Sequence, residues 1–258
     1  MRLRVRSNIK LHVVLSDCHD TVTVPITVEE LNLPLQIQQI DLRPLRSCKN
    51  LGILRLDRNH LKTLDLSPLS NCENLEILDL SENELSSIDL TPLASCSCLW
   101  ELDLGCNLLQ TIDLTPLSKC SRLRNLSLSI DPLLSGTSRA MHKGTATFSD
   151  KVGGAVVTSP LPFLGNRLKS IDLSPLNSCR HLETLHISHN QLQSIDLRPL
   201  SSCTHLRKLF LSHNAIQSID LTPLSSCTEL EELNLENNKF KSVDITPLSS
   251  CYNLQTYL

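Results

Sequence analysis

The sequence predicts an α/β fold in the form of a solenoid, with a concave parallel β-sheet on one side and short helical or 3-10 turns on the convex side. A nine-residue phrase, written "IDLTPLASC" at 88–96, occurs eight times with small variations in the 258 residues. Successive copies begin 24 residues apart with one exception, and such a period is typical of repeat architectures. Each phrase also follows a segment of alternating apolar and polar residues, such as "LEILDL" at 75–80, which indicates a half-buried strand.

Residues 1–34 precede the repeats and are predicted to cover the first turn of the solenoid. Apolar residues alternate at Leu3 and Val5, then over 11–15 and 22–24, which predicts three short strands. The segment "TVEEL" at 27–31 has the spacing of a capping box and predicts one helical turn. We therefore expect an N-terminal β-rich cap over 1–34 and a repeat array over 35–258, because a solenoid end left open would expose its core.

Each repeat is read from its first leucine. In the unit 75–98 the residues Leu75, Leu78 and Leu80 are expected to face the core. Position nine is an asparagine in seven repeats, where the chain leaves the strand. An amide both donates and accepts hydrogen bonds, so we expect a ladder that joins each turn to those above and below. The ladder residues are Asn59, Asn83, Asn107, Asn166, Asn190, Asn214 and Asn238.

The pattern LxxLxLxxNxLxxI over about residues 35–258 resembles the leucine-rich repeat family in its 24-residue class. The resemblance implies a right-handed leucine-rich repeat solenoid. It also implies a protein-protein interaction scaffold or adaptor that binds its partner through the concave face of the sheet.

The repeated phrase is predicted to build the convex side. In "DLTPL", Pro92 suits the first position of a short helix with Thr91 as its cap, and Leu90 and Leu93 then point inward. Asp89 and its equivalents are expected to accept local backbone N–H groups, since stacked carboxylates about 5 Å apart would otherwise repel. A calcium-binding aspartate ladder is the alternative, which the lack of glycine-rich nonapeptides disfavours.

Eleven cysteines are present, and eight of them end the repeated phrase. One shared position indicates buried thiols that pack the back wall of the core. Disulfides along the column are the alternative, because the spacing of about 5 Å is within their range. The N-terminus lacks the apolar core of a signal peptide. We therefore predict a cytoplasmic protein with reduced cysteines: Cys48, Cys72, Cys96, Cys120, Cys179, Cys203, Cys227 and Cys251.

Composition and motifs exclude several function classes at the level of the sequence. A net charge of −3 gives no basic field for nucleic acid, and no apolar run has the length of a membrane span. No nucleophile–base set or phosphate-binding loop is found, so we expect no enzyme and no cofactor. The one metal candidate is a zinc site at His186, His189 and His213. The alternative is a duplicated segment, "ISHN" at 187–190 and "LSHN" at 211–214, with solvated histidines.

Two regions depart from the repeat. The excess of about 131–165 holds five of the seven glycines and is a functional or disordered loop, an irregular repeat or a retained non-coding stretch. The irregular repeat would use "TSPLPFLGN" at 158–166 as a strand, which Pro162 disfavours. At the other end, "LQTYL" at 254–258 begins another strand and stops, so we expect that the natural chain is longer or associates there.

The candidate partner-binding surface is the set of strand residues that vary between turns. We expect an acidic half around Trp100 and a basic half around Phe210 on one protein-binding face. The alternatives are a solvated face without a partner, a structural element that assembles end to end through an open C-terminal end, and a regulatory subunit of a larger signalling complex. The candidate residues are Arg55, Glu76, Asp79, Glu82, Trp100, Glu101, Asp103, His186, His189, Lys208, Phe210 and His213.

Overall fold

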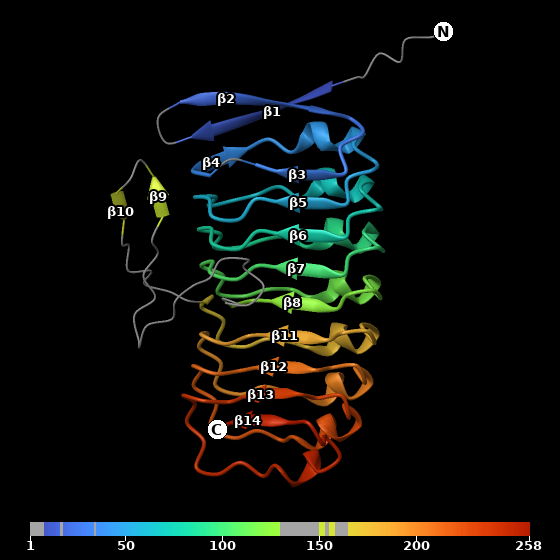
Figure 1. Cartoon of the computed structure of the whole chain (residues 1–258), viewed down its shortest axis with the longest axis vertical. Helices are drawn as coiled ribbons and strands as arrows, with labels where there is room; N and C mark the ends of the chain where they lie inside the picture. The colour runs from blue at the N-terminus through green and yellow to red at the C-terminus, as the bar shows by residue number, and fades with distance from the viewer. Residues whose placement is uncertain (1–7, 16–17, 34, 130–149, 153–154, 158–164) are drawn as a thin grey trace.

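The computed structural model describes residues 8–15, 18–33, 35–129, 150–152, 155–157 and 165–258. Within them, nine strands form one sheet in the order β14-β13-β12-β11-β8-β7-β6-β5-β3, and the strands stack along the long axis in Figure 1. All the paired strands of this sheet are parallel. The strands are β3 Glu30–Asn32, β5 Ile53–Arg55, β6 Ile77–Asp79, β7 Glu101–Asp103, β8 Asn125–Ser127, β11 Thr184–His186, β12 Lys208–Phe210, β13 Glu232–Asn234 and β14 Gln255–Tyr257.

Short 3-10 helices form the opposite side, and the predicted leucine-rich repeat solenoid is confirmed. Leucines from the strands and the helices fill the space between, and Leu75, Leu78, Leu80 and Leu93 have no exposed surface. Each such side chain contributes about 1.5–3 kcal/mol by leaving water. The helices are η1 Arg43–Ser47, η2 Ser67–Asn71, η3 Thr91–Ser95, η4 Thr115–Lys119, η5 Ser174–Ser178, η6 Arg198–Ser202, η7 Thr222–Ser226 and η8 Thr246–Leu248.

The N-terminal end is covered by a second sheet in the order β2-β1-β4. Strands β1 Asn8–Leu15 and β2 His19–Pro25 are antiparallel, as expected for two of the three predicted strands, while Leu3 and Val5 lie outside the described residues. Strand β4 Ile37–Ile40 pairs with β1. Strand β4, which follows residue 34, thus belongs to the cap sheet, whereas β3, which precedes it, belongs to the large sheet. The expected boundary at residue 34 therefore does not separate the two sheets.

The helical turn predicted at 27–31 is wrong. The chain turns where Val28 N–H donates to Pro25 O at 3.0 Å and then enters β3, which pairs with β5. The amides of Gly52 and Ile53 both donate to Glu29 O. The exposed edge of β5 offers a whole row of backbone partners here, which outweighs a local capping-box preference.

Aspartate, not threonine, caps each 3-10 helix. The assigned N-cap of η3 is Leu90, and no side chain of that residue caps it. Instead the Asp89 carboxylate accepts the Thr91 N–H at 2.8 Å, and the prediction that these aspartates bind local backbone is confirmed in all eight copies. Where arginine replaces threonine, its guanidinium also binds the aspartate. The Arg43 side chain thereby lowers the pKa of Asp41 to about 2.

The asparagine ladder is confirmed, but each asparagine binds only one of the two neighbouring turns. The Asn83 Oδ1 accepts the Leu61 N–H at 3.1 Å, and its Nδ2 donates to Leu56 O at 2.9 Å and to Leu80 O at 3.1 Å. Both Leu61 and Leu56 belong to the preceding turn, while Leu80 belongs to the same turn. Each amide thus ties its own turn to the one before it, and not to the one after it.

The cysteine column lines the convex side of the core. Its eight members are buried, and all eleven cysteines are free. The Cys96 thiol lies 3.6 Å from Leu69 O in the preceding turn, and burial raises the pKa of Cys72 to about 11 and of Cys96 to about 12. A thiol held protonated and out of solvent is a poor nucleophile.

We expect thiol titration of the native protein to modify Cys18, which is exposed, and Cys98, which is half-buried, while the buried Cys106 and the eight column cysteines react only in denaturant. A thiol-specific chromophoric reagent with and without denaturant measures this. Fewer than eleven thiols in denaturant would show that disulfides form along the column.

The insertion interrupts one turn between two adjacent positions. Strands β8 and β11 pair directly, so the sheet has no place between them for a further strand from 158–166, most of which lies outside the described residues. Ser129 occupies position seven of the interrupted turn and Gly165 position eight, and the two form a β-bridge. The inserted segment is therefore 130–164, of which β9 Asp150–Val152 and β10 Ala155–Val157 form an antiparallel pair.

Candidate functional site

Side chains on the concave face lie in rows, because equivalent positions of neighbouring turns pair in register. Asp79 faces Asp103 and His186 faces Phe210 across adjacent strands. Turns one to seven are numbered here from their position-one leucines. These are Leu51, Leu75, Leu99, Leu123, Leu182, Leu206 and Leu230.

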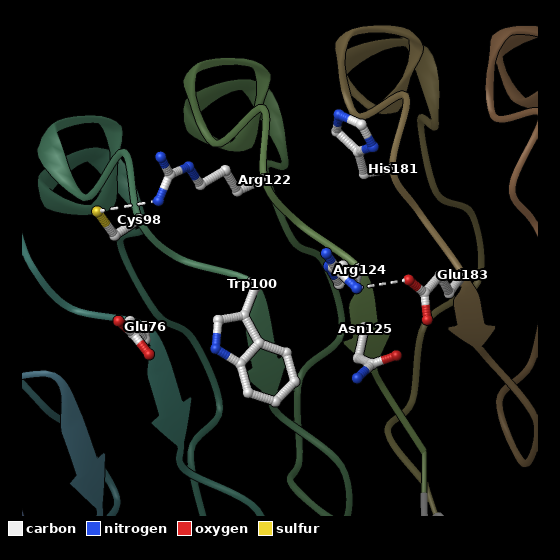
Figure 2. Close-up of a pocket in the computed structure, with 8 residues that line it drawn as sticks. All are labelled: Glu76, Cys98, Trp100, Arg122, Arg124, Asn125, His181 and Glu183. Carbon is white, nitrogen blue, oxygen red and sulfur yellow. Dashed lines mark hydrogen bonds and ion pairs between the residues drawn. The ribbon is translucent and has the colours of Figure 1, made fainter.

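A groove of about 550 Å³ extends over turns two to five. It lies where the start of the concave strands meets the side of the molecule that carries the 3-10 helices. Figure 2 shows the Trp100 indole near its centre, below the Cys98 and Arg122 side chains. Trp100 and Glu76 were predicted as candidate residues. The other lining residues were missed, namely Cys98, Arg122, Arg124, Asn125, His181 and Glu183.

Position two forms a ladder of side chains that includes Trp100. The backbone amide of Trp100 donates to Glu76 O at 2.9 Å, and that of Arg124 donates to Trp100 O at 2.8 Å. The Arg124 guanidinium then pairs with Glu183 at 3.0 Å. In the next turns Arg207 pairs with Glu231 in the same row. Neighbouring charges in this row are therefore neutralised in pairs from turn four onward.

The surface around Phe210 was expected to be a basic half, but its cations are paired with glutamates. Arg207 and Lys208 lie in turn six, but both bind glutamates of turn seven, and the Lys208 Nζ lies 3.6 Å from Glu232. The surface around Phe210 thus carries paired charges and a ring contact, in which the His186 and Phe210 centroids are 4.8 Å apart.

The acidic half has a different character, because two carboxylates share a poorly solvated site. Burial raises the pKa of Asp103 well above its usual range, and the adjacent Asp79 raises it further. Burial also raises the pKa of Asp79. Ser81 binds Asp79 through its N–H at 3.0 Å and its hydroxyl at 2.7 Å, and the Gly105 N–H binds Asp103 at 2.7 Å. The two side chains are held in place, and each opposes ionisation of the other.

The remaining predicted residues of the N-terminal turns lie in ion pairs at the edges of this surface. Arg55 pairs with Glu30 at 3.0 Å, and Glu82 lies 3.6 Å from Arg58. Glu101 is the first residue of β7, directly after Trp100, and is half-buried at position three.

The three histidines of the metal candidate are adjacent but do not surround a common point. His189 and His213 stack with centroids 4.1 Å apart and an angle of 13° between the rings, while His186 contacts Phe210. Among the described residues, no group of three histidine, cysteine or carboxylate side chains could hold a metal ion. His189 and His213 thus lie side by side at position eight of adjacent turns.

Burial of His189 beside His213 makes stability pH-dependent. Burial and the neighbouring His213 lower the pKa of His189 from 6.5 to about 4. The unfolded chain therefore takes up this proton first, and stability falls as the pH decreases from about 6.5 to about 4. After allowance for the water that reaches this ring, we expect a loss of about 1–2 kcal/mol.

Denaturant melts at pH 7 and pH 4.5 should therefore diverge less in a His189→Asn variant than in the wild-type protein. Asparagine tolerates the positive φ of 52° found at His189. An equal change in both proteins would remove His189 as the source.

Comparison with known proteins bears on the fold as a whole. A family model described as leucine-rich repeat matches residues 49–104, 165–216 and 180–240. The internalin C2 of Listeria monocytogenes is similar in structure, with 27% identity and a TM-score of 0.58 over 83% of this chain and 74% of that chain. An internalin inlF of the same organism gives 23% identity and a TM-score of 0.50 over 84% of this chain and 56% of that chain. A search of the curated proteins found no match. In the described part of the chain no helix has the length and apolar character needed to cross a membrane.

Proposed function

Because the chain belongs to the leucine-rich repeat family, we propose that it binds a protein partner through the concave face of its sheet. Leucine-rich repeat proteins typically mediate protein-protein interaction. The observation that carries the proposal is the groove around Trp100, where an aromatic residue lies among charged side chains on an otherwise regular surface. Such aromatic residues are enriched among those that dominate interface energies.

The proposed role is that of a scaffold or adaptor in the cytoplasm, without catalysis, cofactor or nucleic-acid ligand. Free, buried cysteines support a reducing compartment. The net charge of −3 supports a protein ligand over nucleic acid. The absence of a catalytic role would be contradicted by turnover of any substrate in the groove.

The test uses a photo-crosslinking residue in place of Thr184 on the concave face, and, as a control, in place of Ser201 on the convex face. Proteins captured only from the concave position are then measured with the purified array. We expect Glu76→Lys with Glu101→Lys to weaken binding at least tenfold, because both carboxylates lie beside Trp100. Glu73→Lys, outside the sheet, is the matched control. Capture only from Ser201, or equal affinity of all variants, would reject the concave face.

A second proposal, end-to-end assembly, rests on the last turn. Three apolar side chains near this end of the array are exposed, by 93% at Tyr252, 60% at Leu258 and 44% at Ile245. Exposed apolar patches mark surfaces that associate. Sedimentation velocity over a range of concentrations tests it: a rising mass that falls in a Tyr252→Ser, Leu258→Ser variant would support assembly, and a constant monomer mass would remove it.

A further inference from the structure

The Trp100 indole lies open to the groove, and no described cation stacks on it. Figure 2 shows the ring between Glu76 and Asn125, with its nitrogen on the side of Glu76. The aromatic contacts of the described residues involve histidines and Phe210, and Trp100 is in none of them. Its half-buried side chain therefore presents a ring surface to whatever enters the groove.

The nearby arginines are turned toward other groups. Glu183 holds the Arg124 guanidinium at 3.0 Å, on the side away from Trp100. Arg122 donates to the Cys98 Sγ at 3.8 Å, above the ring. Arg55, the cation closest to Asp79 along its row, pairs with Glu30 at 3.0 Å. Arg124 and Arg55 are thus paired with carboxylates, Arg122 lies against a thiol, and none of the three covers the indole.

Glu76 lines the groove beside the indole and has no ion-pair partner in the described part of the chain. It adjoins Trp100 in the position-two row. Asp79 and Asp103 lie in adjacent strands and bind backbone and serine groups instead of cations. These two carboxylates do not line the groove, so Glu76 is the acidic group that a ligand on the indole would meet.

We propose that this groove binds a lysine or arginine side chain of the protein partner, with the cation on the Trp100 ring and against Glu76. The inference rests on the proposed concave-face function and specifies its ligand chemistry. A cation is attracted to the face of tryptophan, and a neighbouring carboxylate adds a charge-assisted hydrogen bond. The aliphatic stem of either side chain would cover apolar surface in the groove.

An acidic or phosphorylated partner segment would require Arg122 and Arg124 to bind it. Arg124 would then have to leave Glu183, whose carboxylate would repel the incoming anion. The observed pairing therefore favours a cationic ligand.

Trp100 is the only tryptophan in the chain, so its fluorescence reports on this groove alone. The probes are the capped peptides Gly-Lys-Gly-Lys-Gly and Gly-Arg-Gly-Arg-Gly, with Gly-Glu-Gly-Glu-Gly as the opposite-charge control, titrated to millimolar concentration at constant ionic strength. We expect the basic peptides to change the emission and to bind at least tenfold more tightly than the acidic one. Glu76→Gln should weaken that binding about fivefold, and Glu73→Gln should leave it unchanged.

Tighter binding of the acidic peptide would overturn the proposal in favour of an anionic ligand. An emission that none of the peptides changes, or an equal affinity of Glu76→Gln and the wild-type protein, would also overturn it. The crosslinking test at Thr184 is independent of these results. A partner captured there without a basic contact residue would leave the concave-face function standing and reject only the cationic ligand.

Discussion

Gly105→Ala is expected to destabilise the protein by about 3 kcal/mol, because no space exists for the added methyl group. A Cβ atom at Gly105 would lie 1.9 Å from Ser129 O and 2.7 Å from Ser129 C. Both of these are backbone atoms, which cannot rotate away as a side chain can. Urea denaturation of the variant, followed by circular dichroism, measures the change. A loss below about 0.5 kcal/mol would show that the neighbouring turn moves freely.

The clash is expected to depend on the insertion. Position seven carries a side chain in the regular turns, at Ser81, Ser188 and Ser212, so an uninterrupted neighbour leaves room there. Deletion of 130–164 joins Ser129 to Gly165, which occupy adjacent positions of one turn, and should leave a folded array. In that background Gly105→Ala should be destabilising by less than about 1 kcal/mol, which a double-mutant cycle measures. Additive effects would mean that Gly105 serves the turn itself and not the insertion.

Much of the fold could be predicted because the same residue types recur at the same positions in every repeat. Leucine spacing predicted the strands and the core, and the position-nine asparagines predicted the ladder. The capping residue could not be settled in this way, since Asp89 and Thr91 are both suited to capping. Only the backbone path shows that Asp89 reaches the Thr91 N–H at 2.8 Å. Strand β3 was missed because its partner edge, β5, is created by the fold and leaves no mark in 27–31.

Two residues of the groove could be predicted because they depart from the repeat. Trp100 and Glu76 differ visibly from their equivalents in other turns, and that difference selected them. The pairing of Arg124 with Glu183 joins residues 59 apart in the sequence, across the insertion, and is not apparent before the register is known. The backbone at position eight was also unexpected, since Glu82, His189 and His213 have φ between 52° and 56°. These candidate residues therefore lie on a strained rim, where asparagine or glycine would be the usual choice.

Asn107→Ala is expected to destabilise the array by about 3 kcal/mol, a loss similar to that of Gly105→Ala. The Asn107 side chain is 1% exposed, and its Oδ1 accepts the Leu85 N–H at 3.0 Å. Its Nδ2 donates to Leu80 O at 3.0 Å and to Leu104 O at 3.1 Å. Alanine would leave the buried Leu85 N–H without a partner, while Leu80 O and Leu104 O would each lose one of their two amide donors and keep Asn83 and Asn166.

The matched control for this change is Asn238→Ala, in the seventh turn. Asn238 makes the same set of bonds, with Ile216 N–H at 3.1 Å and Leu211 O at 2.9 Å, but its side chain is only partly buried. Water can replace the lost partners there, so we expect a loss of about 1–2 kcal/mol. Asn107→Asp should cost at least as much as Asn107→Ala, because its second carboxylate oxygen would be buried against the carbonyls that Nδ2 binds. Urea melts of the three variants rank them, and equal losses for Asn107→Ala and Asn238→Ala would show that burial does not set the strength of the ladder.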